Sequence, residues 1–262
     1  MDDALRADPG AALHLLADLT TATDEHLRAQ ARRLAGRILL ELGRRDTGRP
    51  GGAGRLRPVA ADRGGDLDLD RSMDALAAAR ADRRPAGLAE LWTTDWHRPG
   101  LAVCLLVDAS GSMTGARLAA SAMTAAACAW RAPGEFAVLS FARDVRVHRS
   151  IHAAAPPVHA VDSLLALRGH GVTSVAGALA AAADQLATAR AARRVTVLLS
   201  DCRATDERDP LPAARALDEL LVLAPADDCA EAVDLVRRAG GRLATLRSAA
   251  DAPAALAEAL GR

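Results

Sequence analysis

The sequence predicts an α/β domain, doubly wound around a mostly parallel sheet with helices on both faces. From about residue 98 onward, short apolar stretches alternate with helical patterns, which is the order of elements in such sheets. Several of these stretches are almost continuously apolar, as in Val195-Thr-Val-Leu-Leu, and such strands are typical of a sheet covered on both faces. Half of the 262 residues are hydrophobic, so the chain can supply a sizeable core.

Each element of this domain is expected from its local pattern. Strands are expected at residues 101–108, 135–142, 145–149, 194–200, 219–224 and 242–247. Helices are expected at residues 116–131, 158–167, 174–190, 210–217, 228–239 and 252–260. The step Phe141-Ala-Arg-Asp144 is short enough for a hairpin, so the strand at 145–149 is expected to be an antiparallel edge strand.

The residues before this domain differ from it in composition. Leucine, isoleucine and alanine recur near helical spacing between residues 10 and 44, which predicts an N-terminal helical extension. Residues 45–66 are rich in Arg, Gly and Pro and are expected to be a flexible linker. A short half-buried extended segment at 66–70 and a helix from Ser72 to Arg80 follow. We therefore divide the chain into a helical segment (1–48), a linker and upstream segment (49–97) and the α/β domain (98–262).

Composition excludes several classes of function. The 33 basic and 33 acidic residues cancel, which gives no general basis for binding nucleic acid or a membrane surface. Lysine is absent, so the chain has neither a G-x-x-x-x-G-K-[ST] phosphate loop nor a lysine base. No apolar run approaches the ~18 residues of a membrane span, and the first residues do not resemble a signal peptide, so we expect a cytoplasmic protein. The four cysteines are scattered, which argues against a disulfide scaffold or a zinc site.

Oxygen-bearing side chains lie at three of the predicted strand and helix boundaries. Asp108 ends the first strand, and Ser110 and Ser112 follow it. Asp201 follows the strand at 194–200, and Thr173 precedes a long helix. Loops at the carboxyl ends of parallel strands converge where the strand order reverses, so Asp108 and Asp201 meet if their strands are neighbours. Carboxylate and hydroxyl oxygens suit Mg²⁺ or Mn²⁺. These five residues therefore form our predicted metal site.

The chemistry of this donor set also predicts what the ion would bind. Hydroxyl ligands are neutral, so a cation held by Ser110, Ser112 and Thr173 would keep most of its charge. Such an ion favours one more anionic ligand, and a carboxylate from a partner protein would serve. The N-terminal end of the helix after Met113 adds a favourable field for that anion.

The pattern of these residues resembles the metal-ion-dependent adhesion site of the von Willebrand factor A (VWA) family. That site has the pattern D-x-S-x-S, then a threonine and then an aspartate, which match Asp108 to Ser112, Thr173 and Asp201. The resemblance covers about residues 98–262 and implies a Rossmann-like fold that binds proteins through its cation. Cys202 is a departure, because many members have glycine after the last aspartate.

The upstream segment narrows the resemblance. The stretch Asp-Leu-Asp-Leu-Asp-Arg-Ser-Met-Asp-Ala-Leu from Asp66 is similar to intracellular members that work with MoxR-type AAA+ ATPases. The resemblance implies an adaptor whose bound cation receives an acidic side chain from a client protein or from the ATPase. The alternative within the same family is the VWA subunit of a magnesium or cobalt chelatase-like complex.

An aspartate-dependent phosphohydrolase is a further alternative, with Asp108 as the nucleophile. Such enzymes resemble D-x-D, whereas Ser110 stands at the second carboxylate position, and they commonly need a lysine that this chain lacks. We therefore expect a binding protein and not an enzyme.

Overall fold

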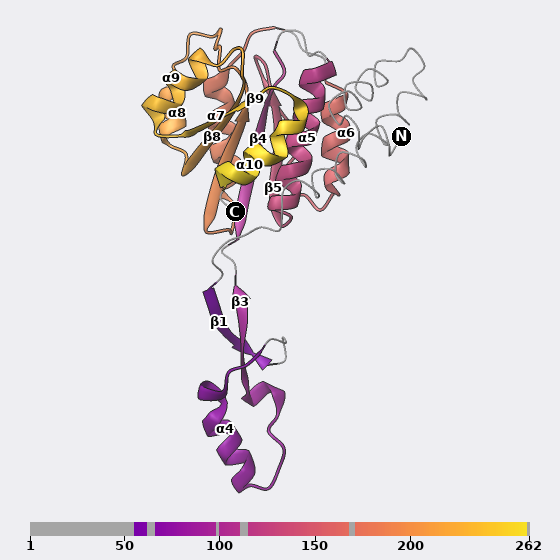
Figure 1. Cartoon of the computed structure of the whole chain (residues 1–262), viewed down its shortest axis with the longest axis vertical. Helices are drawn as coiled ribbons and strands as arrows, with labels where there is room; N and C mark the ends of the chain where they lie inside the picture. The colour runs from indigo at the N-terminus through magenta and orange to yellow at the C-terminus, as the bar shows by residue number, and fades with distance from the viewer. Residues whose placement is uncertain (1–54, 62–65, 98–99, 111–114, 168–170, 261–262) are drawn as a thin grey trace, which may run out of the picture. The chain divides into compact units, whose positions relative to one another are not determined.

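The computed structural model describes residues 55–61, 66–97, 100–110, 115–167 and 171–260 (Figure 1). The chain divides into two compact units, of which the smaller spans Gly52–Pro99 and the larger contains Gly100–Arg262. The helical extension predicted over residues 1–48 lies outside the described residues.

The larger unit is built on one six-stranded sheet with the strand order β6-β5-β4-β7-β8-β9. Its strands are β4 (Leu101–Asp108), β5 (Glu135–Phe141), β6 (Val145–Arg149), β7 (Arg193–Leu199), β8 (Glu219–Pro225) and β9 (Arg242–Leu246). Neighbouring strands are parallel, except that β6 pairs with β5 in the antiparallel direction at one edge. The predicted mostly parallel sheet and its antiparallel edge strand are confirmed.

Helices cover both faces of this sheet and make three layers. They are α5 (Gly115–Arg131), α6 (Pro157–Leu165), α7 (Val175–Ala187), α8 (Leu211–Arg215), α9 (Ala230–Ala239) and α10 (Ala252–Leu260). One core joins the sheet to α5, α6 and α10, and a second core joins it to α7, α8 and α9. No helix in the described ranges is long and apolar enough to cross a membrane.

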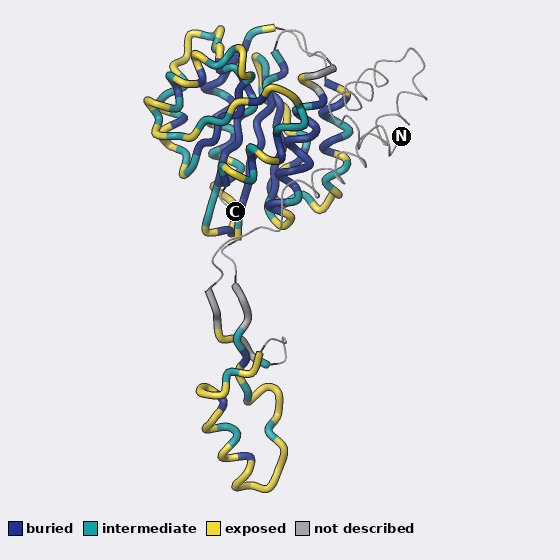
Figure 2. The backbone as a smooth tube through the Cα atoms, viewed as in Figure 1, coloured by how far each residue is buried: buried dark blue, intermediate teal, exposed yellow. Residues whose placement is uncertain are grey.

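The central strands are apolar over most of their length because both of their faces are covered. In β4, Val103 and Leu105 belong to the first core, while Cys104 and Leu106 belong to the second. All four are fully buried, and Figure 2 shows the same burial along the neighbouring strands. In a strand with both faces buried, apolar residues do not alternate with solvent-facing polar ones. This explains the long apolar runs in the sequence.

The smaller unit is a three-stranded antiparallel sheet with one helix. Its elements are β1 (Arg55–Ala60), β2 (Asp66–Leu67), α4 (Leu69–Ala81), the 3₁₀ turn η2 (Leu88–Glu90) and β3 (Trp92–His97), with the strand order β1-β3-β2. Asp68 begins α4 by accepting a hydrogen bond from the Arg71 amide at 3.1 Å, as N-terminal caps do.

Two predictions for this region are wrong. Residues 55–60 form strand β1 and not a flexible linker; Pro58 fits there because β1 is an edge strand. The extended segment is only two residues long and exposed, since the Asp68 cap starts the helix at Leu69, before the predicted Ser72.

Candidate metal centre

The candidate site lies at the carboxyl edge of the large sheet, where the strand order reverses. β4 pairs with β7 in parallel from Leu101 and Arg193 to Val107 and Leu199. The chain adds β5 and β6 on one side of β4, and β7, β8 and β9 on the other. The loops after β4 and β7 therefore leave the same edge beside each other, as expected for the ligand-binding crevice of such sheets.

Hydrogen bonds from two loops fix the Asp108 carboxylate. Its Oδ1 accepts bonds from the Ser110 amide at 2.9 Å and the Ser110 hydroxyl at 2.5 Å. Its Oδ2 accepts a bond from the Ser200 hydroxyl at 2.5 Å. The loop after β4 and the loop after β7 are thus joined directly through the Asp108 carboxylate at the end of β4.

Backbone hydrogen bonds attach the loop after β4 to the end of β5. They also attach the end of β5 to the loop before α7, which carries Thr173. The Ala109 amide donates to the Phe141 carbonyl at 2.8 Å, and the Ser174 amide donates to the Ala142 carbonyl at 2.9 Å. Because residues 141 and 142 are adjacent, the chain before α7 lies next to the loop that carries Asp108.

Three hydrogen bonds attach the loop before α7, which carries Thr173, to the loop after β7, which carries Asp201. The Thr173 amide donates to the Thr205 hydroxyl at 2.7 Å, and the Thr205 amide donates back to the Thr173 carbonyl at 3.0 Å. The Ser174 hydroxyl donates to Asp206 Oδ2 at 2.6 Å. Together with the Asp108 bonds, these contacts form a closed ring of hydrogen bonds that links the three loops at this edge of the sheet.

The oxygens in this ring fit a hard divalent cation. Asp201 Oδ1 accepts a bond from the Arg203 amide at 3.0 Å, and no described residue donates to its Oδ2. The Thr173 hydroxyl makes no hydrogen bond among the described residues, although the residue is buried. The Ser110 hydroxyl gives its proton to Asp108 and keeps its lone pairs. These atoms are therefore available to a cation.

The structure brings four predicted ligand positions to one edge, namely Asp108, Ser110, Thr173 and Asp201. Ser112 lies outside the described residues. Across the described ranges, no cluster of three or more His, Cys, Asp or Glu side chains could hold a metal. A site at this edge therefore depends on hydroxyl groups as well as on the two aspartates.

Cys202 adopts the backbone conformation that favours glycine. Its φ is +64°, in the left-handed region. Its amide donates to the Ser200 hydroxyl at 2.9 Å, which holds the turn directly behind Asp201. Burial, followed by the nearby carboxylates of Asp201 and Asp108, raises the pKa of the Cys202 thiol to about 12. The thiol stays protonated at neutral pH, so it is not an anionic ligand.

The supporting residues of the ring, Ser200, Ser174, Thr205 and Asp206, were not predicted from the sequence. A weak signal was present, because Ser200 directly precedes Asp201 and because two polar pairs, Thr173-Ser174 and Thr205-Asp206, lie in the two loops. Their pairing is visible only once the loops are brought together.

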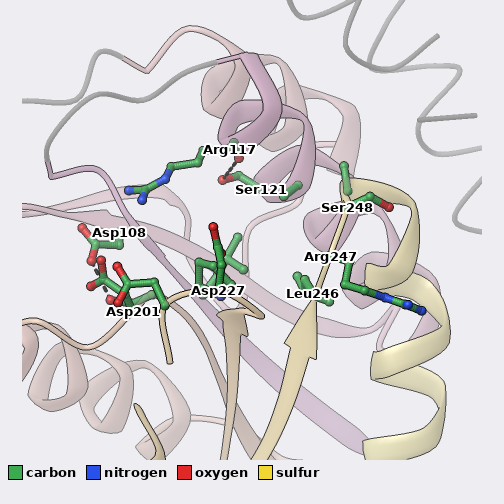
Figure 3. A pocket seen from close by; sticks show the side chains of 14 residues that line it. Asp108, Arg117, Ser121, Asp201, Asp227, Leu246, Arg247 and Ser248 are labelled. Carbon is green, nitrogen blue, oxygen red and sulfur yellow. Dashed lines mark hydrogen bonds between the residues drawn. The ribbon is translucent and has the colours of Figure 1, made fainter. Parts of the chain in front are cut away.

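A pocket of about 350 Å³ opens beside this site (Figure 3). Asp108 and Asp201 lie at one side, Arg117 comes from the first turn of α5, and Asp227 and Arg247 come from the chain after β8 and β9. The site thus adjoins a space large enough for part of another molecule.

The strand order and the helical layers are those of a VWA fold, and a family model agrees. The family described as "VWA domain containing CoxE-like protein" matches residues 44–259. The chain therefore belongs to this family, and the match includes the smaller unit.

Two solved structures share the fold at low sequence identity, and a third has a slightly lower TM-score. BatB, a conserved hypothetical protein from Bacteroides thetaiotaomicron, has a TM-score of 0.50 at 15% identity, over 62% of this chain and 97% of that one. A D319A mutant of the PilB minor pilin from Streptococcus sanguinis has a TM-score of 0.50 at 12% identity, over 64% and 62%. A von Willebrand factor type A structure from Catenulispora acidiphila has 20% identity and a TM-score of 0.48, over 64% and 43%. A comparison with curated proteins found no match.

Proposed function

We propose that this chain is a divalent-cation-dependent protein-binding module that acts as an adaptor between a MoxR-type AAA+ ATPase and a client protein. The observation that carries the proposal is the hydrogen-bonded ring that brings Asp108, Ser110, Thr173 and Asp201 to one edge of the sheet. Membership of the CoxE-like family supports it, because an adaptor to a MoxR ATPase fits this family in general.

Residues of the ring, together with Ser112, would hold Mg²⁺ or Mn²⁺ in two ways. Ser110, Ser112 and Thr173 would offer neutral hydroxyl oxygens, while Asp108 and Asp201 would act directly or through water. When bound, the ion supplies a positive charge that attracts one further anionic ligand. The chain keeps that charge uncompensated by using hydroxyls, and a carboxylate from the partner completes the set.

The residues around Asp108 support binding rather than catalysis. Both of its carboxylate oxygens accept hydrogen bonds from serine hydroxyls, at 2.5 Å each. A phosphohydrolase of the D-x-D type would have a second carboxylate where Ser110 stands and commonly a lysine, which this chain lacks. The VWA proteins of this type are generally non-catalytic, which agrees with this assignment.

The test measures capture of the MoxR-type ATPase from the same organism by the immobilised full chain. We expect capture in millimolar Mg²⁺ and its loss in a chelator or in the Ser110→Ala, Ser112→Ala double variant. Thr188→Ala is the matched control, because this hydroxyl lies at the far end of α7 and donates to the Gln185 carbonyl at 2.9 Å. Equal capture with and without chelator would contradict the proposal.

A further inference from the structure

Arg117 lies in the pocket beside the candidate metal centre with its charge directed toward the aspartates. It belongs to the first turn of α5 and is exposed. Figure 3 shows its guanidinium reaching toward Asp108 and Asp201, while the side chain of Arg247 points away from them. The Ser121 hydroxyl donates to the Arg117 carbonyl at 2.8 Å, within the same turn of helix.

The charge of Arg117 is not neutralised by the described part of the chain. Another arginine near the pocket, Arg203, pairs with Asp228 at 2.6 Å and with Glu231 at 3.7 Å. Arg117 makes no such pair with any described carboxylate, and residues 111–116 contain no acidic residue that could supply one. With respect to the described residues, its guanidinium is therefore available to an anion from another molecule.

The aspartates on this side of the pocket form hydrogen bonds with the loops after β4 and β7 and no ion pair with Arg117. Both oxygens of Asp108 accept hydroxyl bonds, and Asp201 Oδ1 accepts an amide bond. A carboxylate from a partner has two oxygens, so it can contact the cation with one and a guanidinium with the other. Arginine suits this role because its planar group offers several donors in one plane.

We propose that Arg117 is a second anchor for the partner's carboxylate, which it holds together with the bound cation. This inference rests on the proposed function and specifies the ligand of the same site. The pocket volume of about 350 Å³ admits a short segment around that acidic residue. Asp227 is exposed on the other side of the pocket and repels a second acid. The segment therefore presents one carboxylate toward Arg117 and an uncharged or basic side chain toward Asp227.

The test compares Arg117→Ala, Arg117→Lys and Arg247→Ala in the full chain. Two quantities are measured: the affinity for the same MoxR-type ATPase in Mg²⁺, and Mn²⁺ binding by the isolated chain. We expect Arg117→Ala to weaken capture at least tenfold and Arg117→Lys to weaken it less, with Mn²⁺ binding within twofold of the original. Arg247 lines the same pocket, so Arg247→Ala is the control. Its affinity for the ATPase and its Mn²⁺ binding should both stay within twofold of those of the original chain.

Three results are decisive and distinguishable. If Arg117→Ala captures the ATPase as well as the original chain does, while the Ser110→Ala, Ser112→Ala variant captures none, the role of Arg117 is overturned and the proposed function stands. If the serine variant also captures normally, both are overturned. Loss of Mn²⁺ binding in Arg117→Ala would likewise contradict the role, because it would place Arg117 in support of the cation instead of the partner.

Discussion

At the scale of single residues, two serine hydroxyls orient the Asp108 carboxylate. The Ser110 hydroxyl donates its proton to Asp108 and keeps its lone pairs. The Ser200 hydroxyl donates to Asp108 and accepts from the Cys202 amide. A serine can therefore orient a carboxylate and still accept a bond from a neighbouring group.

The left-handed backbone of Cys202 gives a testable result. We expect Cys202→Gly to be more stable than Cys202→Ala by about 1 kcal/mol, because both remove the thiol but only glycine accepts a positive φ without strain. Urea unfolding of the two variants under identical conditions measures the difference. Equal stabilities, or a more stable alanine variant, would show that the conformation at this position costs little.

The sequence predicted the types of residue in the centre better than their contacts. The acid and hydroxyls of Asp108 to Ser112, together with Thr173 and Asp201, form a pattern that can be recognised along the chain. The bond from Ser200 to Asp108 joins residues 92 positions apart, and the bond from Ser174 to Asp206 joins residues 32 apart. No local pattern specifies such pairs, since they depend on how the loops meet.

At the scale of elements, the buried strands were predicted best. β4 matches its predicted residues 101–108, because a continuous apolar run followed by an acid marks both of its ends. The end of α7 was predicted less well. It stops at Ala187 instead of residue 190, although the sequence there favours a helix. The Glu135 carboxylate accepts bonds from the amides of Arg190 and Ala191 at 2.7 and 2.6 Å, which draws this segment out of the helix.

The β5–β6 hairpin carries a histidine that links its two strands. The Ser140 hydroxyl and His148 Nε2 are hydrogen-bonded at 2.7 Å. Burial, and then the charge of Arg146, lowers the pKa of His148 from its ordinary value of 6.5 to about 4. Between these values the unfolded chain binds a proton that the folded chain does not, so stability falls as the pH drops from 6.5 toward 4.

We expect His148→Gln to reduce this loss of stability with falling pH. The urea midpoint, measured with chelator between pH 4 and 6.5, should decrease less for the variant than for the original chain. His159→Gln, at an exposed histidine on α6, is the control and should leave the slope unchanged. An unchanged slope in His148→Gln would mean that His148 titrates alike in the folded and unfolded chains.

At the scale of the whole molecule, topology creates the candidate centre. Each loop comes from a different part of the chain, and the reversal of strand order at β4 brings the loops after β4 and β7 together. The family match begins at residue 44, so the smaller unit is part of what defines the family. Its strands β1 and β3 were not predicted, because their pairing joins segments that are far apart in sequence and only partly apolar.

The most direct test of the metal centre is calorimetric titration of the chain with Mn²⁺. We expect one saturable site, and Ser110→Ala, Thr173→Ala and Asp201→Asn should each weaken it at least ~10-fold, which corresponds to about 1.4 kcal/mol. One variant comes from each loop, and Thr188→Ala should bind as the original chain does. Absence of saturable binding, or equal binding in all three variants, would contradict a cation held jointly by the three loops.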